Sequence, residues 1–196
     1  LLFHSVVQNP PSDPDLPGEA AEEIPALRET VVVTAARTEQ PLLDAVSLVS
    51  VLDRQDLRRS PALVLDDHLR RIPGFSLFRR SSSVSSHPTT QGVSLRGIGP
   101  SGTSRSLVLF DGIPLNDPFG GWVYWNRIPT LALSQVEVSR GANSQLYGSS
   151  ALGGTVQLRP LAIEGGRFEI LGQLGNRQTY DVSALASDRK GDWGYL

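Results

Sequence analysis

The segment Ser106-Leu-Val-Leu-Phe-Asp-Gly-Ile-Pro-Leu115 carries the strongest short-range folding signal of this chain. Two apolar runs, residues 106–110 and 113–115, flank the dipeptide Asp111-Gly112. An Asp-Gly pair readily adopts the two positive φ angles that a two-residue hairpin turn requires. The segment therefore predicts two antiparallel strands joined by a tight turn.

Strand and helix patterns precede this hairpin. Residues 46–52 form a strand candidate, and Asp53 can then cap a short helix with Asp56 at its third position. Ser60-Pro61 predicts a second helix start, because proline is favoured at the first helical position. An apolar face at helical spacing follows, and a Pro-Gly pair ends it. That face consists of Ala62, Leu65, Leu69 and Ile72.

The strands predicted after the hairpin become longer beyond Pro160. Residues 135–139 and 153–158 are typical of short strands, whereas the last two segments alternate over a longer stretch. Each of these two approaches the ~10 residues of a membrane-barrel strand. An ordinary antiparallel sheet shows the same alternation, so both alternatives stay open. The alternating positions are Phe168, Ile170, Gly172 and Leu174, followed by Tyr180, Val182, Ala184 and Ala186.

Length and composition limit the number of domains and the kinds of chemistry available to this chain. The 196 residues suffice for one ordinary domain plus a remainder. Because there is no cysteine, disulfides, cysteine–zinc sites and thiol catalysis are excluded. Every basic residue except Lys190 is an arginine, a bias that fits enclosed ion pairs as well as codon usage. The basic residues are scattered, so we expect no nucleic-acid partner.

Little in the sequence supports an enzyme. Gly97-x-Gly99-x-x-Gly102 matches a dinucleotide-binding pattern, but that site needs a helix next, and residues 106–110 predict a strand. A nucleotide-binding α/β enzyme is therefore the weakest alternative. Asp66, Asp67 and His68 are consecutive, so they fan around a helix, and we expect solvated side chains instead of a metal site. We predict no catalytic residue, metal or cofactor.

Two predicted loops carry side chains suited to ligand binding. A serine-rich loop holds Arg79 and Arg80, and a glycine-rich loop holds Trp122, Tyr124 and Trp125. Loops carried on a rigid scaffold are common ligand sites. Aromatic rings beside arginine suit a ligand with rings or negative charge. Plain surface loops are the alternative interpretation.

The order of six short segments is more informative than any one motif. These segments are Glu29–Ala35, Leu69–Gly74, Ser94–Gly97, Leu107–Pro114, Val136–Gly141 and Leu146–Gly154. Each segment is weak alone. Together, over about residues 29–160, they resemble the plug domain of TonB-dependent outer-membrane transporters. The resemblance implies an α+β fold, in which a plug with a small mixed β-sheet and short helices is followed by the first strands of a transmembrane β-barrel.

The resemblance divides the chain into four parts. Residues 1–28, which are rich in proline and acidic residues, form a disordered leader. Residues 29–35 resemble a TonB box, residues 36–160 form the plug, and residues 161–196 begin the barrel. A β-branched extended segment can add a strand to a partner's sheet edge, and an ordinary first strand of the domain is the alternative. The box-like residues are Glu29, Thr30, Val31, Val32, Val33, Thr34 and Ala35.

Roles for single residues come from the same resemblance. Arg96 and Arg140 match arginines that, in the family, pair with glutamates of the barrel. Four glycines match turn positions that need positive φ or close approach: Gly97, Gly112, Gly141 and Gly148. The loops that would face the substrate contain Arg79, Arg80, Asn116, Trp122, Tyr124 and Trp125.

The implied function is energy-coupled import of a scarce, large ligand, such as a siderophore–metal chelate or a cobalamin. Residues 32–41 are especially similar to the vitamin B12 branch of the family. The implied partners are the C-terminal domain of TonB, within the TonB–ExbB–ExbD complex, and the chain's own C-terminal barrel. The implied location is the outer membrane, with the N-terminus in the periplasm. A stand-alone plug-like binding or adaptor module is the other alternative.

Overall fold

The structure is a computed structural model that describes residues 48–79, 81–87, 91–98, 104–141, 143–176 and 178–196, together with the backbone of residues 32–33 and 40–41. Within these ranges, no helix has the length and apolar character needed to cross a membrane.

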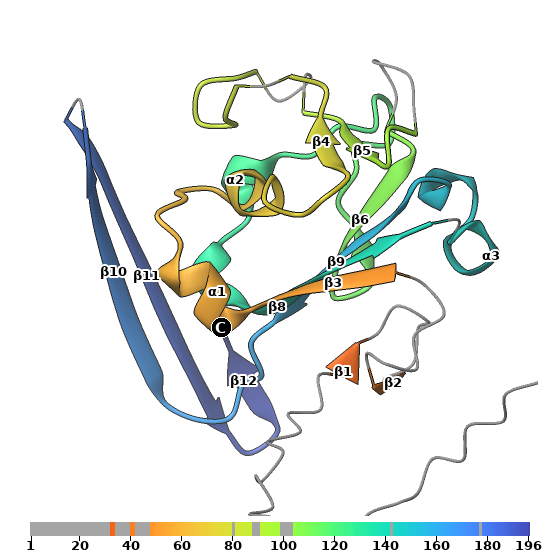
Figure 1. The fold of residues 1–196 in the computed structure, drawn as a ribbon. Helices are drawn as coiled ribbons and strands as arrows, with labels where there is room; N and C mark the ends of the chain where they lie inside the picture. Colours follow the sequence, from red (N-terminus) through yellow and green to blue (C-terminus); the bar gives the residue numbers. More distant parts are fainter. Residues whose placement is uncertain are drawn as a thin grey trace, which may run out of the picture.

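A mixed five-stranded sheet forms the centre of the fold (Figure 1). Its order is β3-β8-β9-β6-β7, where β9 and β6 are parallel and the other neighbours are antiparallel. A short helical turn separates β8 from β9, and a crossover connects β7 to β8. The strands are β3 (Leu48–Asp53), β6 (Ser106–Phe110), β7 (Ile113–Pro114), β8 (Leu133–Arg140) and β9 (Gly154–Pro160).

Two local predictions from the sequence are confirmed in this sheet. Asp111 and Gly112 join β6 to β7 with φ angles of 48° and 80°, as a tight hairpin turn requires. Asp53 caps helix α1 (Arg54–Arg59), because its side chain accepts a hydrogen bond from the Asp56 backbone N–H. The Asp56 carboxylate in turn accepts a hydrogen bond from the Asp53 backbone N–H. Both features arise from interactions between residues close in sequence, which explains why the sequence reveals them.

The predicted start of the second helix is wrong. Ser60 is extended, with ψ of 138°, and ends α1 instead of capping a new helix. Proline disfavours helical backbone angles at the residue before it, so Pro61 holds Ser60 in this extended conformation. Helix α2 (Leu65–Leu69) begins later, after Val64, and no side chain caps it. The apolar face is retained, because Leu65 and Leu69 are fully buried.

The main core lies between one face of the sheet and helices α1 and α2, which Figure 1 shows on the same side of the sheet. Trp125 is its largest fully buried side chain, and its ring meets Phe75 edge to face at 6.3 Å between centroids. Alternate residues of β8 and β9 contribute to this face. The buried members are Leu57, Leu65, Leu69, Ile72, Phe75, Val93, Leu95, Val108, Val123, Trp125, Leu133, Val136, Val138, Val156 and Leu158.

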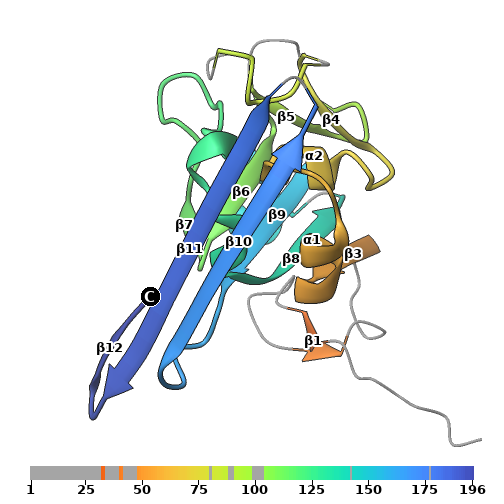
Figure 2. The ribbon, with the colours of Figure 1, turned by 90° about the vertical axis from the view of Figure 1, so that its left-hand side faces the viewer.

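Three smaller β-units surround this core. Strands β4 (Phe75–Leu77) and β5 (Val93–Leu95) pair at one end, and β1 (Val32–Val33) pairs with β2 (Gln40–Pro41). Strands β10 (Arg167–Gly175), β11 (Thr179–Lys190) and β12 (Trp193–Tyr195) form an antiparallel meander. Figure 2 shows β10 and β11 as a long hairpin across the plug, beside α1. The other short elements are η3 (Trp125–Arg127), η4 (Thr130–Ala132), α3 (Ser144–Tyr147) and η5 (Ser149–Ala151).

We predict that Gly154→Ala destabilises the chain far more than Gly112→Ala. Gly154 has φ of 138°, and an added methyl group would overlap the carbonyl oxygen of Ser139 and lie 2.8 Å from Leu95 Cδ1. Strain and overpacking together should cost roughly 2–5 kcal/mol. Gly112 has a φ of 80°, nearer the left-handed helical region, and open space around it, so its substitution should cost about 1 kcal/mol.

Urea unfolding followed by tryptophan fluorescence measures both losses. Equal losses at the two positions would contradict the close approach at Gly154.

Candidate functional site

The β10–β11 hairpin has two chemically different faces. Phe168, Ile170, Leu174, Tyr180 and Val182 are all at least 64% exposed on the side away from the plug. The intervening residues, which include Glu169 and Leu185, are half-buried or buried against the plug. This alternation has the period of two that a sheet with one apolar outer face requires.

Glu169 of β10 joins the hairpin to helix α1. Both oxygens of its carboxylate accept hydrogen bonds from Arg54 Nη2 at 2.9 Å. Arg58 and Arg167 lie at 3.5 Å from the same carboxylate. The Arg54 and Glu169 side chains are only 21% and 17% exposed, so this pair is screened less than a surface pair.

Arg54 also fixes the start of β8. Its Nη1 donates to the carbonyl oxygens of Leu131 and Leu133 at 3.1 and 2.9 Å. An apolar contact lies beside it, where Leu171 of β10 packs against Leu131, Ala132, Leu161 and Leu185. The guanidinium therefore connects α1, η4, β8 and β10 at one point.

This ion pair was not predicted from the sequence. Other arginines carried the expected ion pairs, and the polar positions of the last two segments were expected only as spacers between apolar ones. The available signal was the charge of Glu169 on the face of β10 opposite to Phe168 and Ile170. A charge on the inward face of such a strand indicates a partner on whatever that face covers.

The structure gives Arg96 and Arg140 different surroundings. Arg140 donates from Nη1 to the carbonyl oxygen of Pro73 at 2.9 Å and from Nη2 to Ser50 Oγ at 2.7 Å. Its Nε is buried and has no hydrogen-bond partner. Arg96 is exposed and has φ of 59°. Their pairing with carboxylates of a barrel stays a prediction.

The four glycines assigned to turns all have positive φ. The angles are 70° at Gly97, 80° at Gly112, 138° at Gly141 and 77° at Gly148. No atom lies within 4 Å of the position that a Cβ would take at any of them, so backbone conformation, not close approach, favours glycine there.

The residues assigned to the glycine-rich loop divide into three environments. Asn116 stabilises the loop itself, because its amide bonds the backbone of Ser106, Val108 and Gly121. Tyr124 lies half-buried with the Arg127 guanidinium 4.7 Å from its ring centroid, and Trp122 is also half-buried. Trp125 is 1% exposed in the core, so its assignment to a substrate-facing surface is wrong. Its apolar bulk decides its position, since burying an indole ring removes a large area from water.

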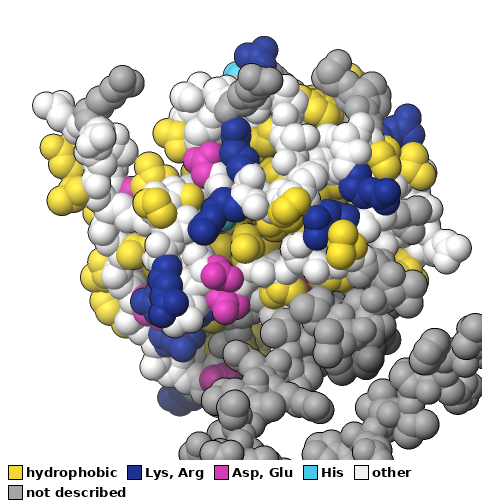
Figure 3. Space-filling model, viewed as in Figure 1, with side chains coloured by type: hydrophobic (Ala, Val, Ile, Leu, Met, Phe, Trp, Pro, Cys, Tyr) yellow, Lys and Arg dark blue, Asp and Glu magenta, His cyan; other side chains and the backbone are white. Residues whose placement is uncertain are grey.

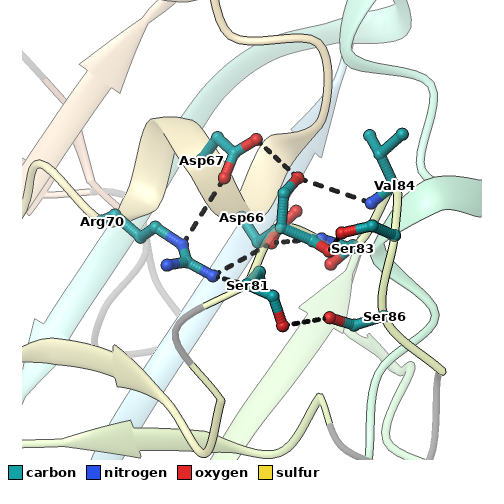
Figure 4. Close-up of polar contacts among 9 residues, drawn as sticks. Asp66, Asp67, Arg70, Ser81, Ser83, Val84 and Ser86 are labelled. Carbon is teal, nitrogen blue, oxygen red and sulfur yellow. Dashed lines mark hydrogen bonds and ion pairs between the residues drawn. The ribbon is translucent and has the colours of Figure 1, made fainter.

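The serine-rich loop packs against helix α2 (Figure 4). Asp66, predicted to be solvated, is fully buried and accepts a hydrogen bond from the Ser83 backbone N–H. His68 is also buried, at 2% exposure. Burial raises the pKa of Asp66 and lowers the pKa of His68, since both charged forms are desolvated. Arg79 is exposed, and Arg80 lies outside the described residues.

Of the TonB-box-like segment, only Val32 and Val33 are described, as β1, and Glu29–Val31 with Thr34–Ala35 lie outside the described residues. Among the described residues there is no group of three side chains suited to hold a metal ion. On the face drawn in Figure 3, Lys and Arg side chains are dispersed and form no continuous basic surface.

The nucleotide pattern lacks its structural requirement. Residues 106–110 form strand β6, whereas a phosphate site of that kind needs a helix N-terminus after its glycines. Gly99 and Gly102 lie outside the described residues.

Comparison with known proteins identifies the fold. The family model described as TonB-dependent Receptor Plug Domain matches residues 41–155. The chain belongs to the TonB-dependent receptor plug domain family. This agrees with the α+β fold predicted from the sequence, and the relatives are transporters and receptors, not enzymes.

Relatives of the plug match this chain over much of its length. A protein named vitamin B12 transporter BtuB, from Vibrio vulnificus, is 34% identical over 130 residues, which are 66% of this chain and 20% of that protein. The protein of the same name from Vibrio cholerae is 35% identical over 133 residues, 67% of this chain and 20% of its own length. The chain therefore spans about one fifth of these relatives.

Solved structures share the fold at lower identity. The ferric yersiniabactin uptake receptor FyuA from Yersinia pestis aligns with a TM-score of 0.58 and 24% identity over 74% of this chain and 22% of that chain. The siderophore receptor PiuA from Acinetobacter baumannii aligns with a TM-score of 0.59 and 24% identity over 78% of this chain and 20% of that chain.

We predict that Glu169→Gln destabilises the contact between plug and hairpin. The change leaves three arginines near a neutral side chain and removes a partly buried carboxylate acceptor, at a cost of about 1–3 kcal/mol. Glu164→Gln, at an exposed position three residues before Arg167, is the matched control and should cost less than about 0.5 kcal/mol. Thermal unfolding of both variants checks this, and equal melting temperatures would argue against the ion pair.

A second prediction concerns pH. The folded-state pKa of Asp66 lies above its unfolded value, so the stability associated with the neutral carboxyl is present at low pH and is lost as pH rises through the folded pKa. Asp66→Asn is neutral at every pH. Its unfolding free energy, relative to that of the wild type, should therefore increase as pH rises above the ordinary range of an aspartate carboxyl. Urea unfolding across this range measures the difference, and a constant difference would disprove the prediction.

Proposed function

We propose that this chain is the N-terminal plug part of a TonB-dependent outer-membrane transporter, in which the plug is followed by the first strands of a transmembrane β-barrel. The observation that carries the proposal is the succession of two features in one chain. A plug-family match over residues 41–155 is followed directly by the β10–β11 hairpin. The exposed apolar face of that hairpin suits contact with lipid, and its polar face packs on the plug.

The parts of the chain then take separate roles. Residues 1–28 are the periplasmic leader, residues 29–35 the TonB-coupling segment, residues 36–160 the plug, and residues 161–196 the start of the barrel wall. The ligand is a scarce, large molecule that the barrel excludes while the plug is in place. A cobalamin or a siderophore–metal chelate is favoured, because the relatives are named as a vitamin B12 transporter and as siderophore receptors.

The sheet suggests how a pull from the N-terminus would act. Among the described strands, β3 lies at the edge of the sheet and pairs with β8 alone, so removing it breaks one such ladder from Leu48 to Asp53. The next residue is Arg54, which is bound to Glu169 of β10 and to two backbone carbonyls. A pull that detaches β3 therefore loads an ionic anchor on the hairpin at the very next residue, Arg54.

The coupling segment can be tested by binding. The full chain should bind the C-terminal domain of TonB, and Val32→Pro should abolish that binding. Proline removes a backbone donor from β1 and prevents strand addition to a partner's sheet. Ala20→Pro, in the leader, is the control that should bind normally. A pull-down compares the three proteins.

Binding that survives in Val32→Pro would refute residues 29–35 as the coupling segment. Loss of binding in that variant alone would support TonB-driven transport.

A further inference from the structure

Three consecutive residues of the serine-rich loop are held by side chains from one short helix and from the residue directly after it. We define the serine loop as residues 81–87, between β4 and β5. Figures 1 and 2 show it at one end of the plug, with β1 at the other. The helix is α2, whose Leu65 and Leu69 are fully buried in the core. The loop is therefore attached to a helix that is anchored in the main core.

Each attachment uses a different side chain (Figure 4). Arg70, directly after α2, donates from Nη2 to the carbonyl oxygen of Ser81 at 2.7 Å. Asp67 Oδ2 accepts from Ser82 Oγ at 2.9 Å. Asp66 Oδ2 accepts from the backbone N–H of Ser83 at 3.3 Å. Arg70 also pairs with both carboxylates, at 3.9 Å from Asp66 and 3.5 Å from Asp67.

The cluster is poorly explained by stability alone. Asp66 is fully buried and its Oδ1 has no hydrogen-bond partner, while its other carboxylate oxygen interacts with Ser83. A buried carboxylate with an unpartnered oxygen is costly, and native proteins contain few such groups. The charged groups that face it are Asp67 and Arg70 on its own helix, and the serine loop supplies only the uncharged Ser83.

The same attachments leave one surface of the loop open. Val84 is 61% exposed, and Ser85 is also exposed. The hydroxyls of Ser81 and Ser86 bond each other across the base of the loop. Arg79, at the entrance to the loop, is exposed. The result is a hydroxyl-rich surface with a cationic side chain beside it, whose backbone is already ordered.

We propose that Asp66, Asp67 and Arg70 are positioning residues, which hold residues 81–83 in one conformation so that the serine loop is a preformed contact for an oxygen-rich ligand. The proposal rests on the proposed function for the identity of the ligand, whereas the ordering of the loop does not depend on it. Preforming a loop lowers the conformational entropy that binding must otherwise overcome. Hydroxyl groups act as donors and acceptors, so they suit amide, hydroxyl or carboxylate groups of such a ligand.

The loop's mobility tests the proposal directly. The 196 residues contain no cysteine, so Val84→Cys in the full-length protein introduces a labelling position on the loop. A nitroxide at this position reports local motion by electron paramagnetic resonance. Adding Asp66→Leu removes the acceptor for Ser83 N–H, and the label should then move several-fold faster. Adding Asp66→Asn retains an acceptor of the same shape and should restore slow motion.

Two further variants keep the result interpretable. Arg71→Ala changes an exposed residue one position after Arg70, and its label should move as slowly as in the parent. Arg70→Ala removes the contact to Ser81 without placing an apolar group in the buried site, so it provides a second test if Asp66→Leu does not fold. The proposal would be overturned if the label moved no faster than in the parent in folded Asp66→Leu or in Arg70→Ala. It would also be overturned if Asp66→Asn increased the motion of the label as much as Asp66→Leu does.

Ligand addition separates this proposal from the proposed function. With saturating cyanocobalamin or a ferric siderophore, the parent label should slow further, and Asp66→Leu should bind the same ligand several-fold more weakly. Equal affinity in parent and loosened variant would overturn the ligand role of the loop. A parent that binds neither probe would contradict the proposed function, while the mobility comparison would still decide whether Asp66 and Arg70 position the loop.

Discussion

Strand β8 is the element on which the rest of the fold depends. It pairs with β3 along one edge and with β9 along the other, and its alternate side chains separate two environments. Val136 and Val138 enter the main core beneath the helices. The ladder with β9 also requires Gly154, because a side chain there would collide with the backbone of β8 at Ser139. Each end of β8 involves an arginine. Arg54 donates a hydrogen bond to the carbonyl oxygen of Leu133, the first residue of β8, and Arg140 is its last residue.

The sequence predicted those parts of the fold that depend on neighbours in the chain. The Asp111-Gly112 turn, the Asp53 capping box and the alternation in β10 and β11 are local patterns, and each has the predicted structure. The errors arose where distant segments decide the outcome. Asp66 is buried because residues 81–83 fold back over α2, and a helical pattern alone contains no sign of that. Trp125 was assigned to a loop surface from its composition, although the need to bury its ring outweighs its neighbourhood.

The candidate sites follow the same rule. The turn glycines could be chosen from the sequence, because positive φ is a property of the local backbone. The ion pair between Arg54 and Glu169 joins residues that are 115 positions apart, so no spacing rule identifies it. Arginines are numerous in this chain, and choosing the one that meets a carboxylate requires the packing of α1 on β10. The family resemblance directed attention instead to Arg96 and Arg140, whose pairing with barrel carboxylates stays a prediction.

The two anchored regions suggest different mechanical properties for the two ends of the plug. At one end, the serine loop is attached through hydrogen bonds to a helix whose apolar face is fully buried. At the other, β3 is a single edge strand that leads directly to the Arg54–Glu169 pair. A pull applied from the N-terminus would therefore load the β3–β8 ladder first and the ion pair at Arg54 next. Such an order allows β3 to detach while the serine loop stays attached to α2, because the hydrogen bonds that hold the loop involve no residue of β3.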